Sequence, residues 1–219
     1  MTAKISAAIT FALCLTLQMA CAAGTTKPEN TSASPLLKAA STGDTQTLNS
    51  LIKTKVNIDE KDPKGNTALM IAASNGQKKA AKLLMENKAA VNIKNQMGQT
   101  ALYFALINEQ NDIAIDLINQ GADLDNISDD GESALIIATT ANANEIMNTI
   151  IKKMPSLVNK ASNSSTTPLM EAARFGSAKT INILLKAGAN KKLQNQNGKT
   201  ALDIAIKAQN EDAIHLLRK

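Results

Sequence analysis

The fold of this chain is decided by residues 62–76, which read DPKGNTALMIAASNG. Gly65 suits a tight turn, and Thr67 is a typical helix N-cap, whose hydroxyl accepts a hydrogen bond from an otherwise unpaired amide of the first turn. The small pair Ala72–Ala73 lets a neighbouring helix approach closely. We expect Gly76 to end the helix in the left-handed conformation that other residues resist. The segment therefore predicts a turn followed by a short, closely packed helix.

The same pattern returns along the whole chain. The leucine that follows each cap recurs at intervals of 33, 33, 33, 34 and 33 residues, at Leu36, Leu69, Leu102, Leu135, Leu169 and Leu202. A second apolar series keeps the same intervals, at Leu51, Leu84, Leu117, Ile150, Leu184 and Leu217. Two independent series with one shared insertion indicate internal repeats. The predicted repeats cover approximately residues 34–61, 62–94, 95–127, 128–161, 162–194 and 195–219.

This repeat resembles that of the ankyrin family, which has the same period and begins its first helix with a TPLH-like motif. The endings AGAN at 187–190 and GADLD at 121–125 are similar to the family's GADVN. The resemblance covers residues 34–219 and implies an all-α fold, an ankyrin-repeat solenoid of six helix-turn-helix repeats with projecting β-turn fingers. We expect one continuous core, because no repeat can bury its apolar face alone.

Several positions depart from the family pattern. The motif histidine is replaced in every repeat, by Leu37, Met70, Tyr103, Ile136, Met170 or Asp203, so the hydrogen bonds that it usually makes between repeats are expected to be missing. The fifth repeat has Ser165 where the other turns have glycine, and it follows a one-residue insertion near 154–156, so we expect a local distortion there.

The helix ends carry two further expectations. Gly43 and Gly176 occupy the place of Gly76 and are predicted to be left-handed as well. In the last repeat, polar residues are expected to face solvent and to end the stack, namely Asp203, Lys207, Glu211 and Arg218.

The N-terminus reads as a targeting segment. Lys4 precedes an apolar run from Ile5 to Leu17, which has the length of a signal-peptide core and is too short to span a bilayer. We predict a signal peptide at 1–22, cut after Ala22, with lipidation at Cys21 and membrane anchoring as the alternative. Residues 23–33 are predicted to be a flexible tether, and 34–219 the ankyrin-repeat domain.

Little in the sequence suggests catalysis, so we expect that the protein is not an enzyme and uses no cofactor or metal. His215 is the single histidine, and both cysteines, Cys14 and Cys21, lie in the targeting segment. Neither a nucleophile–histidine arrangement nor a His/Cys metal cluster can be assembled from these. The net charge of +5 comes from lysines scattered among acidic residues, which does not indicate nucleic-acid binding.

Repeat proteins bind partners on the concave surface that stacking creates. The family resemblance places that surface on the finger tips and the exposed ends of the first helices, and aromatic, Met and Arg residues are the usual anchors of interfaces. The predicted protein-binding residues are Lys64, Asn66, Met97, Gln99, Tyr103, Ile107, Asp129, Asp130, Glu132, Thr140, Arg174 and Phe175. The acidic group at 129–132 allows two interpretations, a solvated turn or a docking site for an electropositive partner.

These features lead to a functional hypothesis. We expect a non-catalytic protein-binding module in the bacterial periplasm, monomeric when alone, that acts as an inhibitor or immunity protein and blocks a periplasmic enzyme such as a peptidoglycan hydrolase. The alternatives are a scaffold or assembly factor for an exported enzyme, for example an oxidative-stress enzyme, or a secreted effector that binds a host protein. Membrane attachment is expected only through lipidation at Cys21.

Overall fold

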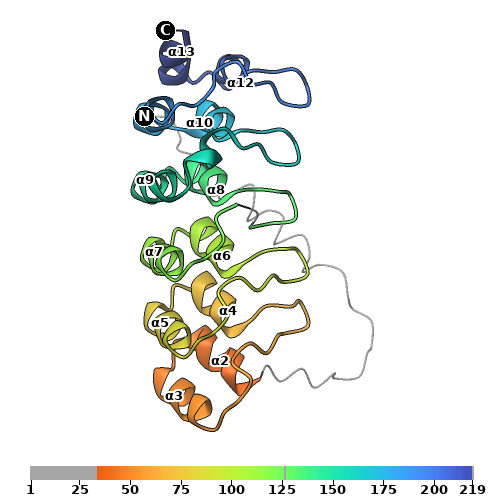
Figure 1. The fold of residues 1–219 in the computed structure, drawn as a ribbon, viewed down its shortest axis with the longest axis vertical. Helices are drawn as coiled ribbons and strands as arrows, with labels where there is room; N and C mark the ends of the chain where they lie inside the picture. The colour runs from red at the N-terminus through yellow and green to blue at the C-terminus, as the bar shows by residue number, and fades with distance from the viewer. Residues whose placement is uncertain (1–33, 126, 219) are drawn as a thin grey trace, which may run out of the picture. The chain divides into compact units, whose positions relative to one another are not determined.

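The computed structural model describes residues 34–125 and 127–218. Over these residues the chain folds into helix pairs that stack one on the next, with a loop projecting between successive pairs (Figure 1). The pairs are α2 (Pro35–Thr42) with α3 (Thr45–Lys53), α4 (Ala68–Ser74) with α5 (Lys78–Glu86), α6 (Ala101–Ile107) with α7 (Asn111–Asn119), α8 (Ala134–Thr140) with α9 (Asn144–Lys153), α10 (Pro168–Phe175) with α11 (Ala178–Lys186), and α12 (Ala201–Ala208) with α13 (Glu211–Arg218). A short 3₁₀ helix, η1 (Pro155–Asn159), follows α9. The predicted all-α solenoid of six repeats is confirmed.

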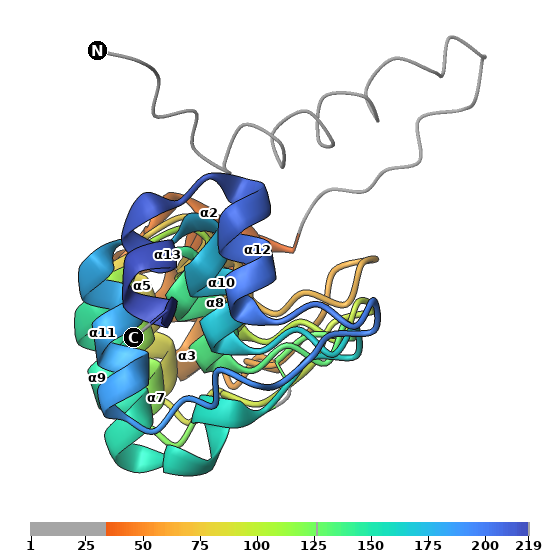
Figure 2. The same ribbon diagram turned by 90° about the horizontal axis from the view of Figure 1, so that it is seen from above.

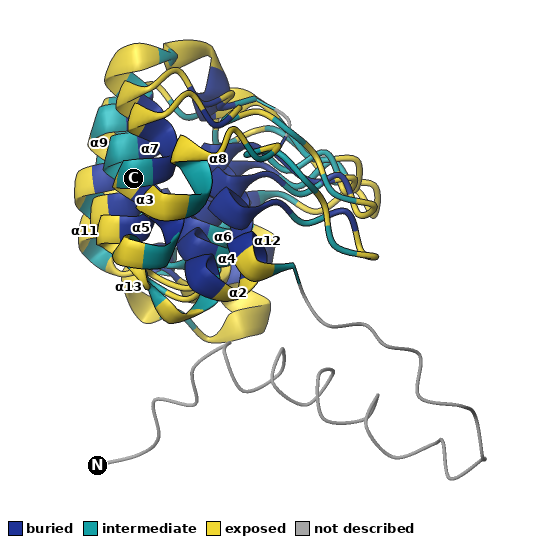
Figure 3. Ribbon diagram, turned by 90° about the horizontal axis from the view of Figure 1, so that it is seen from below, coloured by how far each residue is buried: buried dark blue, intermediate teal, exposed yellow. Residues whose placement is uncertain are grey.

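The helices form two layers. Figure 2 shows the first helices of the pairs in one layer, the second helices in another, and the loops superposed on one side. Burial is greatest between the layers, where the ribbon of Figure 3 is darkest. Leu69, Leu102 and Leu135 of the recurring series are at most 1% exposed. Each repeat thus buries its apolar residues against its neighbours, in one continuous core.

Most of the predicted caps are present. Thr67 Oγ1 accepts from the Met70 amide at 3.3 Å, and the first helix of every other repeat also begins with a capping Ser or Thr. Gly43 and Gly76 have φ of 74° and 68°, as predicted. The prediction for Gly176 is wrong, because its φ is −75°. A Cβ at Gly176 would lie 2.5 Å from the Ala172 carbonyl oxygen, so close backbone approach explains this glycine.

The loops between pairs form five fingers, which we name after the helix that follows: the α4 finger (62–66), α6 finger (95–99), α8 finger (128–132), α10 finger (162–166) and α12 finger (195–199). The turn glycines Gly65, Gly98, Gly131 and Gly198 all have positive φ. Ser165 takes the same conformation, with φ of 59°. The α10 finger therefore keeps the turn despite its serine.

The one-residue insertion produces the local change that was expected. It is absorbed by η1, whose Leu157 and Val158 are buried in the core. At the first two junctions, a side chain links the loops that follow successive second helices: Asp59 accepts from the Ala90 amide at 2.9 Å, and Asn92 accepts from the Asp123 amide at 2.8 Å. At the junction next to the insertion, Asp125 forms an ion pair with Lys160 instead.

The chain lacks the motif histidine, and asparagine side chains near the ends of the first helices connect its repeats. Asn75 Nδ2 donates to Ser41 Oγ at 3.0 Å, and Asn210 Nδ2 donates to the Gly176 carbonyl at 3.0 Å. Asn142 Oδ1 accepts from the Ser177 amide at 3.0 Å and from the Thr180 hydroxyl at 2.8 Å. These bonds join the turns between first and second helices of adjacent repeats.

The last repeat is only partly polar on its outer side. Asp203, Lys207, Glu211 and Arg218 are exposed, as predicted. Ile206, however, is 49% exposed, although the same position is fully buried in the preceding repeats. It is exposed because the described stack places no further helix pair against α12. Among the described residues, no helix is both long enough and apolar enough to cross a membrane.

Candidate functional site: the finger face

We define the finger face as the finger tips together with the exposed sides of the first helices. Backbone hydrogen bonds hold the fingers side by side: the Gln96 amide donates to the Lys64 carbonyl at 3.1 Å, and the Asn163 amide to the Asp130 carbonyl at 3.0 Å. Amide side chains add links, from Gln96 to the Pro63 carbonyl at 2.9 Å and from Gln196 to the Asn163 carbonyl at 2.7 Å. The fingers thus form a preorganised row, which lowers the cost of ordering on binding.

Each finger is also braced from within. Asp62 Oδ1 accepts from the amides of Lys64 and Asn66, both at 2.8 Å, and Asn95 Oδ1 accepts from those of Met97 and Gln99, both at 2.9 Å. The side chains of Asn66 and Gln99 both accept from Asn95 Nδ2. These two predicted binding residues therefore brace the fingers, while Lys64 extends into solvent.

The α8 finger carries the predicted acidic group. Asp129 and Asp130 are exposed, and the Asp129 amide donates to the Met97 carbonyl at 3.2 Å. Glu132 is half-buried, and the Ser128 hydroxyl donates to its carboxylate at 3.2 Å. Burial raises the pKa of the Glu132 carboxyl, and the negative charges of Asp130 and Glu171 raise it further, against the Ser128 hydrogen bond. Negative charge is therefore concentrated at this finger.

Glu171 of α10 extends the acidic region, and sequence reasoning missed it. Its side chain is half-buried, and this burial raises the pKa of its carboxyl, while the nearby Arg174 lowers it. The Arg174 guanidinium lies 5.6 Å from the centroid of the Phe175 ring. The sequence offered one signal for this residue, its position in the repeat. Glu171 is a charged residue at the position that is apolar in other repeats, at Ile71, Phe104 and Ile137.

The apolar members of the predicted site are not equally accessible. Met97 is 63% exposed, Phe175 49% and Ile107 37%. Tyr103 is only 6% exposed, and its ring meets that of Phe104 edge-on, with centroids 5.7 Å apart. Tyr103 therefore serves mainly as a core residue, and it offers a partner little surface. Thr140 is half-buried, and its hydroxyl donates to the Ile136 carbonyl at 3.1 Å.

A hollow of about 120 Å³ lies on the finger face between α4 and α6. It is lined by Asn66, Met70, Ile71, Ser74, Asn75 and Phe104. Apart from Asn66, none of these was in the predicted binding set. A wider hollow of about 320 Å³ lies at the turns between the first and second helices of the second and third repeats. The residues that line it include Lys78 and Asp112. These two form an exposed ion pair of 2.8 Å.

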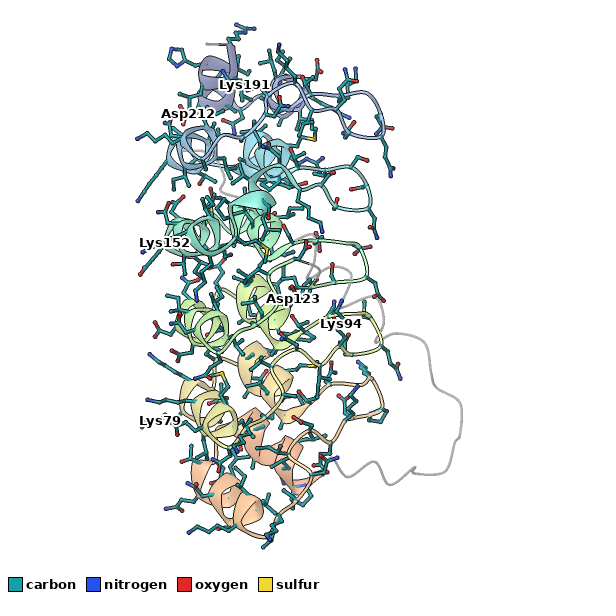
Figure 4. The ribbon with its side chains drawn as sticks, in the orientation of Figure 1. Lys79, Lys94, Asp123, Lys152, Lys191 and Asp212 are labelled. Carbon is teal, nitrogen blue, oxygen red and sulfur yellow. The ribbon has the colours of Figure 1, made fainter. Side chains whose placement is uncertain are left out.

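The outer layer of second helices has a different character. Lys79, Lys152 and Asp212, labelled in Figure 4, project from α5, α9 and α13 on the side away from the fingers. Charges of both signs are found on these second helices, as on an ordinary solvated surface. His215 is exposed on α13. Within residues 34–125 and 127–218, His, Cys, Asp and Glu form no cluster of three that could hold a metal ion.

The remaining predictions fall outside the described residues. These are the signal peptide at 1–22 with cleavage after Ala22, the alternative lipidation at Cys21, and the tether at 23–33. The binding role of the finger-face residues also remains a prediction, because the structure fixes only their positions.

Comparison with curated proteins gives short matches. The NAD-capped RNA hydrolase NUDT12 of Homo sapiens is 42% identical over 52 residues, and those of Pongo abelii and Macaca fascicularis match equally. The match covers 24% of this chain, which spans only 11% of the length of these relatives.

Two solved structures match almost throughout. One is a chain from the complex of the Bd0816 predatory endopeptidase from Bdellovibrio bacteriovorus with immunity protein Bd3460, with 36% identity and a TM-score of 0.79. The match covers 85% of this chain and 97% of that one. The other is an ankyrin repeat domain from Acinetobacter baumannii, with 32% identity, a TM-score of 0.76, and coverage of 84% and 96%.

The family model described as "Ankyrin repeats (3 copies)" matches in overlapping windows, at residues 7–95, 36–128, 87–161, 115–195 and 154–219. Ankyrin repeats are in general non-catalytic modules that bind other proteins. Together with the stacked helix pairs and the braced fingers, these matches show that the chain belongs to the ankyrin-repeat family.

Proposed function

We propose that this protein is a non-catalytic inhibitor of the immunity type, which binds a cell-wall-cleaving endopeptidase through the finger face and blocks it. The observation that carries this proposal is the similarity to a chain of an endopeptidase–immunity protein complex, at 36% identity over 97% of that chain. We take the matching chain to be the immunity protein, because it matches a repeat stack almost from end to end.

The geometry of the finger face supports inhibition by obstruction. Its fingers are held in place by the chain's own hydrogen bonds, and Met97 and Phe175 expose large apolar side chains. A rigid surface with apolar anchors binds tightly because little conformational entropy is lost. Such a surface blocks an enzyme by covering the entrance to its active site.

The proposed compartment is the periplasm, where an immunity protein would protect the producing cell from its own enzyme. The apolar N-terminal segment and the confinement of both cysteines to positions 14 and 21 support export. Lipidation at Cys21 would place the same stack on a membrane surface and is part of the same proposal.

The test is an activity measurement. The purified chain is titrated into peptidoglycan endopeptidases from the envelope of the producing organism, and release of soluble cell-wall fragments is followed. We expect one of these enzymes to lose activity with a one-to-one end point. If no endopeptidase is inhibited at micromolar concentration, inhibition is excluded, and a higher yield of active enzyme on co-expression would instead indicate an assembly factor.

Location is measured separately. Fractionation of the producing cells should recover the chain in the periplasm or on its membranes. Recovery of the mature chain from the culture medium would favour a secreted effector instead.

A further inference from the structure

The hollow between α4 and α6 is lined by apolar and polar side chains. Met70, Ile71 and Phe104 are its apolar residues, and Asn66, Ser74 and Asn75 its polar ones. Its volume is about 120 Å³. A buried apolar cavity of about 150 Å³ takes up a benzene molecule. The hollow is smaller and open to solvent on one side, so it has room for part of one aliphatic side chain.

The hollow exists because this repeat has small side chains. Ser74 occupies the place that Ile107, Thr140, Arg174 and Lys207 occupy in later repeats, and Ile71 the place of Phe104. Where α6 faces α8, the larger Ile107 and Phe104 stand at these positions. Ser74 is half-buried, and its hydroxyl accepts only a long hydrogen bond, of 3.4 Å, from Asn108. Ser74 is thus smaller than the residue at this position in each later repeat.

Negative charge lies on the same face, beyond the α6 finger. The α6 finger separates the hollow from the α8 finger and contacts both, through Asn95 to Asn66 and through the Met97 carbonyl to the Asp129 amide. Beyond it lie Asp129, Asp130, Glu132 and Glu171. None of these four forms a salt bridge within the described part of the chain, whose three ion pairs involve other residues. A partner that covers the hollow can therefore reach these carboxylates along the same face, where Lys64 on the α4 finger and Arg174 beside Glu171 are the nearby positive charges.

We propose that the finger face takes a protein segment that seats one leucine-, isoleucine- or methionine-sized side chain between α4 and α6 and places lysine or arginine side chains against the α8 finger. This inference rests on the proposed function only in that it describes the docking surface of the partner. Burial of the apolar side chain in the hollow should lower the dissociation rate, because short-range interface contacts act mainly on that rate. The carboxylates speed association, because long-range attraction steers the basic segment.

The hollow is tested by filling it. Ser74→Met puts a flexible apolar side chain into the space, and Lys207→Met introduces the same residue at the equivalent place on α12, outside the hollow. Circular dichroism and thermal unfolding establish that both variants keep the helical fold. A library of random twelve-residue peptides displayed on phage is selected against the unmodified chain, and the enriched peptides are measured on both variants.

We expect enriched peptides to combine an aliphatic residue with lysine or arginine, to bind Ser74→Met at least tenfold more weakly, and to bind Lys207→Met unchanged. Absence of enrichment, enrichment without basic residues, or equal binding to Ser74→Met would overturn the proposal. The library needs no endopeptidase, so its outcome is independent of the inhibition test.

The charged part has its own test. Asp129→Asn, Asp130→Asn and Glu132→Gln are combined, and the control combines Glu86→Gln, Glu145→Gln and Asp212→Asn on the second helices. With a selected peptide, or with an endopeptidase found by inhibition, the finger variant should lose most of the salt dependence of the association rate. Unchanged association at low salt would contradict the role of the α8 finger, while a matching loss in the control would show a nonspecific charge effect and overturn it equally.

Discussion

Asn142 joins the fourth and fifth repeats through several hydrogen bonds. Its Oδ1 accepts from the Ser177 amide and the Thr180 hydroxyl, and its Nδ2 donates to the Phe175 carbonyl at 3.4 Å. Thr180 is fully buried, so its hydroxyl needs partners within the protein. Asn142 also has φ of 53°, at the helix end where Gly43 and Gly76 stand in earlier repeats. One residue thus ends a helix and links two repeats.

Asn142→Gly removes these hydrogen bonds while keeping a residue that adopts positive φ easily. We expect the free energy of unfolding to fall by about 1–3 kcal/mol, as measured by guanidinium titration. Glu109→Gly is the control, because Glu109 has φ of 56° at the same place in the third repeat. That change should leave stability unaltered or raise it by up to about 1 kcal/mol. A similar response of both variants would show that the bonds of Asn142 contribute little.

Glu171 links stability to pH. Burial raises the pKa of its carboxyl in the folded chain above the ordinary value of 4.5. The folded state then binds more protons than the unfolded state between these two values, so this residue lowers stability as pH rises through the interval. We expect Glu171→Gln to be more stable than the unmodified chain at pH 7.5 and to lose that advantage near pH 4.5.

The measurement is urea unfolding at the two pH values, with the exposed Glu145→Gln as control. An advantage of Glu171→Gln that is the same at both pH values would contradict a protonation effect. A stability gain combined with weaker partner binding would indicate that the carboxylate is kept at this position for recognition.

Residue-level prediction succeeded where one local rule decides the conformation. Ser and Thr caps and the turn glycines follow from unpaired amides and positive φ. Gly176 was predicted wrongly because two reasons for glycine, positive φ and close approach, look identical in a sequence. The links of Asn142 were not predictable, because their partners lie in the next repeat and depend on how closely the two turns pack.

At the scale of elements, the fingers are held by two different constraints. Each turn requires positive φ at its fourth residue. Neighbouring turns are also packed so closely that a side chain at this position would contact the next finger. A Cβ on Gly98 would lie 2.9 Å from the Asp129 backbone nitrogen, whereas a Cβ on Gly198 would meet nothing within 4 Å. In the α12 finger, therefore, only the requirement for positive φ restricts the residue at this position.

Gly98→Ala and Gly198→Ala separate the two constraints. We expect Gly198→Ala to lower the free energy of unfolding by about 1–2 kcal/mol, the cost of a left-handed alanine. Gly98→Ala should cost more, because the α8 finger must shift, and amide NMR shifts should change at Asp129. Equal losses for the two variants would mean that the α6 and α8 fingers are free to move apart.

The helices were predictable from the sequence where the repeats follow the same pattern. The 33-residue interval fixed the number, order and type of the helices. The hollow between α4 and α6 was not foreseen, because it results from the difference in size between Ser74 and the side chains at its equivalents. The near-complete burial of Tyr103 was likewise not foreseen, because it depends on how the repeats pack around the core.

At the scale of the whole molecule, the stack is held by contacts between adjacent repeats, and the junction of the third and fourth repeats differs from the three junctions around it that share one kind of link. Side chains of Asp59, Asn92 and Asn159 bind a backbone amide of the following repeat. Asp125 instead pairs with Lys160, and both side chains are 41% exposed. Partly exposed ion pairs add little stability, so the junction of the third and fourth repeats lacks the side-chain-to-amide link of these three junctions, although the Ala134 amide donates to the Leu124 carbonyl there at 2.9 Å.

Lys160→Ala should weaken this junction further, since it leaves a carboxylate oxygen of Asp125 without its partner. We expect a loss of up to about 1 kcal/mol in the coupling between the halves of the stack. Hydrogen exchange should then show the first three repeats and the last three opening separately, whereas Lys153→Ala, at the exposed end of α9, should leave a single cooperative transition. Retention of one transition in both variants would refute a weak junction.

The short helix η1 has a practical consequence. The chain already carries an additional residue between α9 and the α10 finger, and that finger keeps the same turn and the same bonds to its neighbour. Pro155 and Ser156 there are exposed. This corner is consequently a permissive place to splice in foreign sequence, such as an affinity tag or a fluorescent reporter, which would leave the recognition surface intact for imaging or purification of complexes.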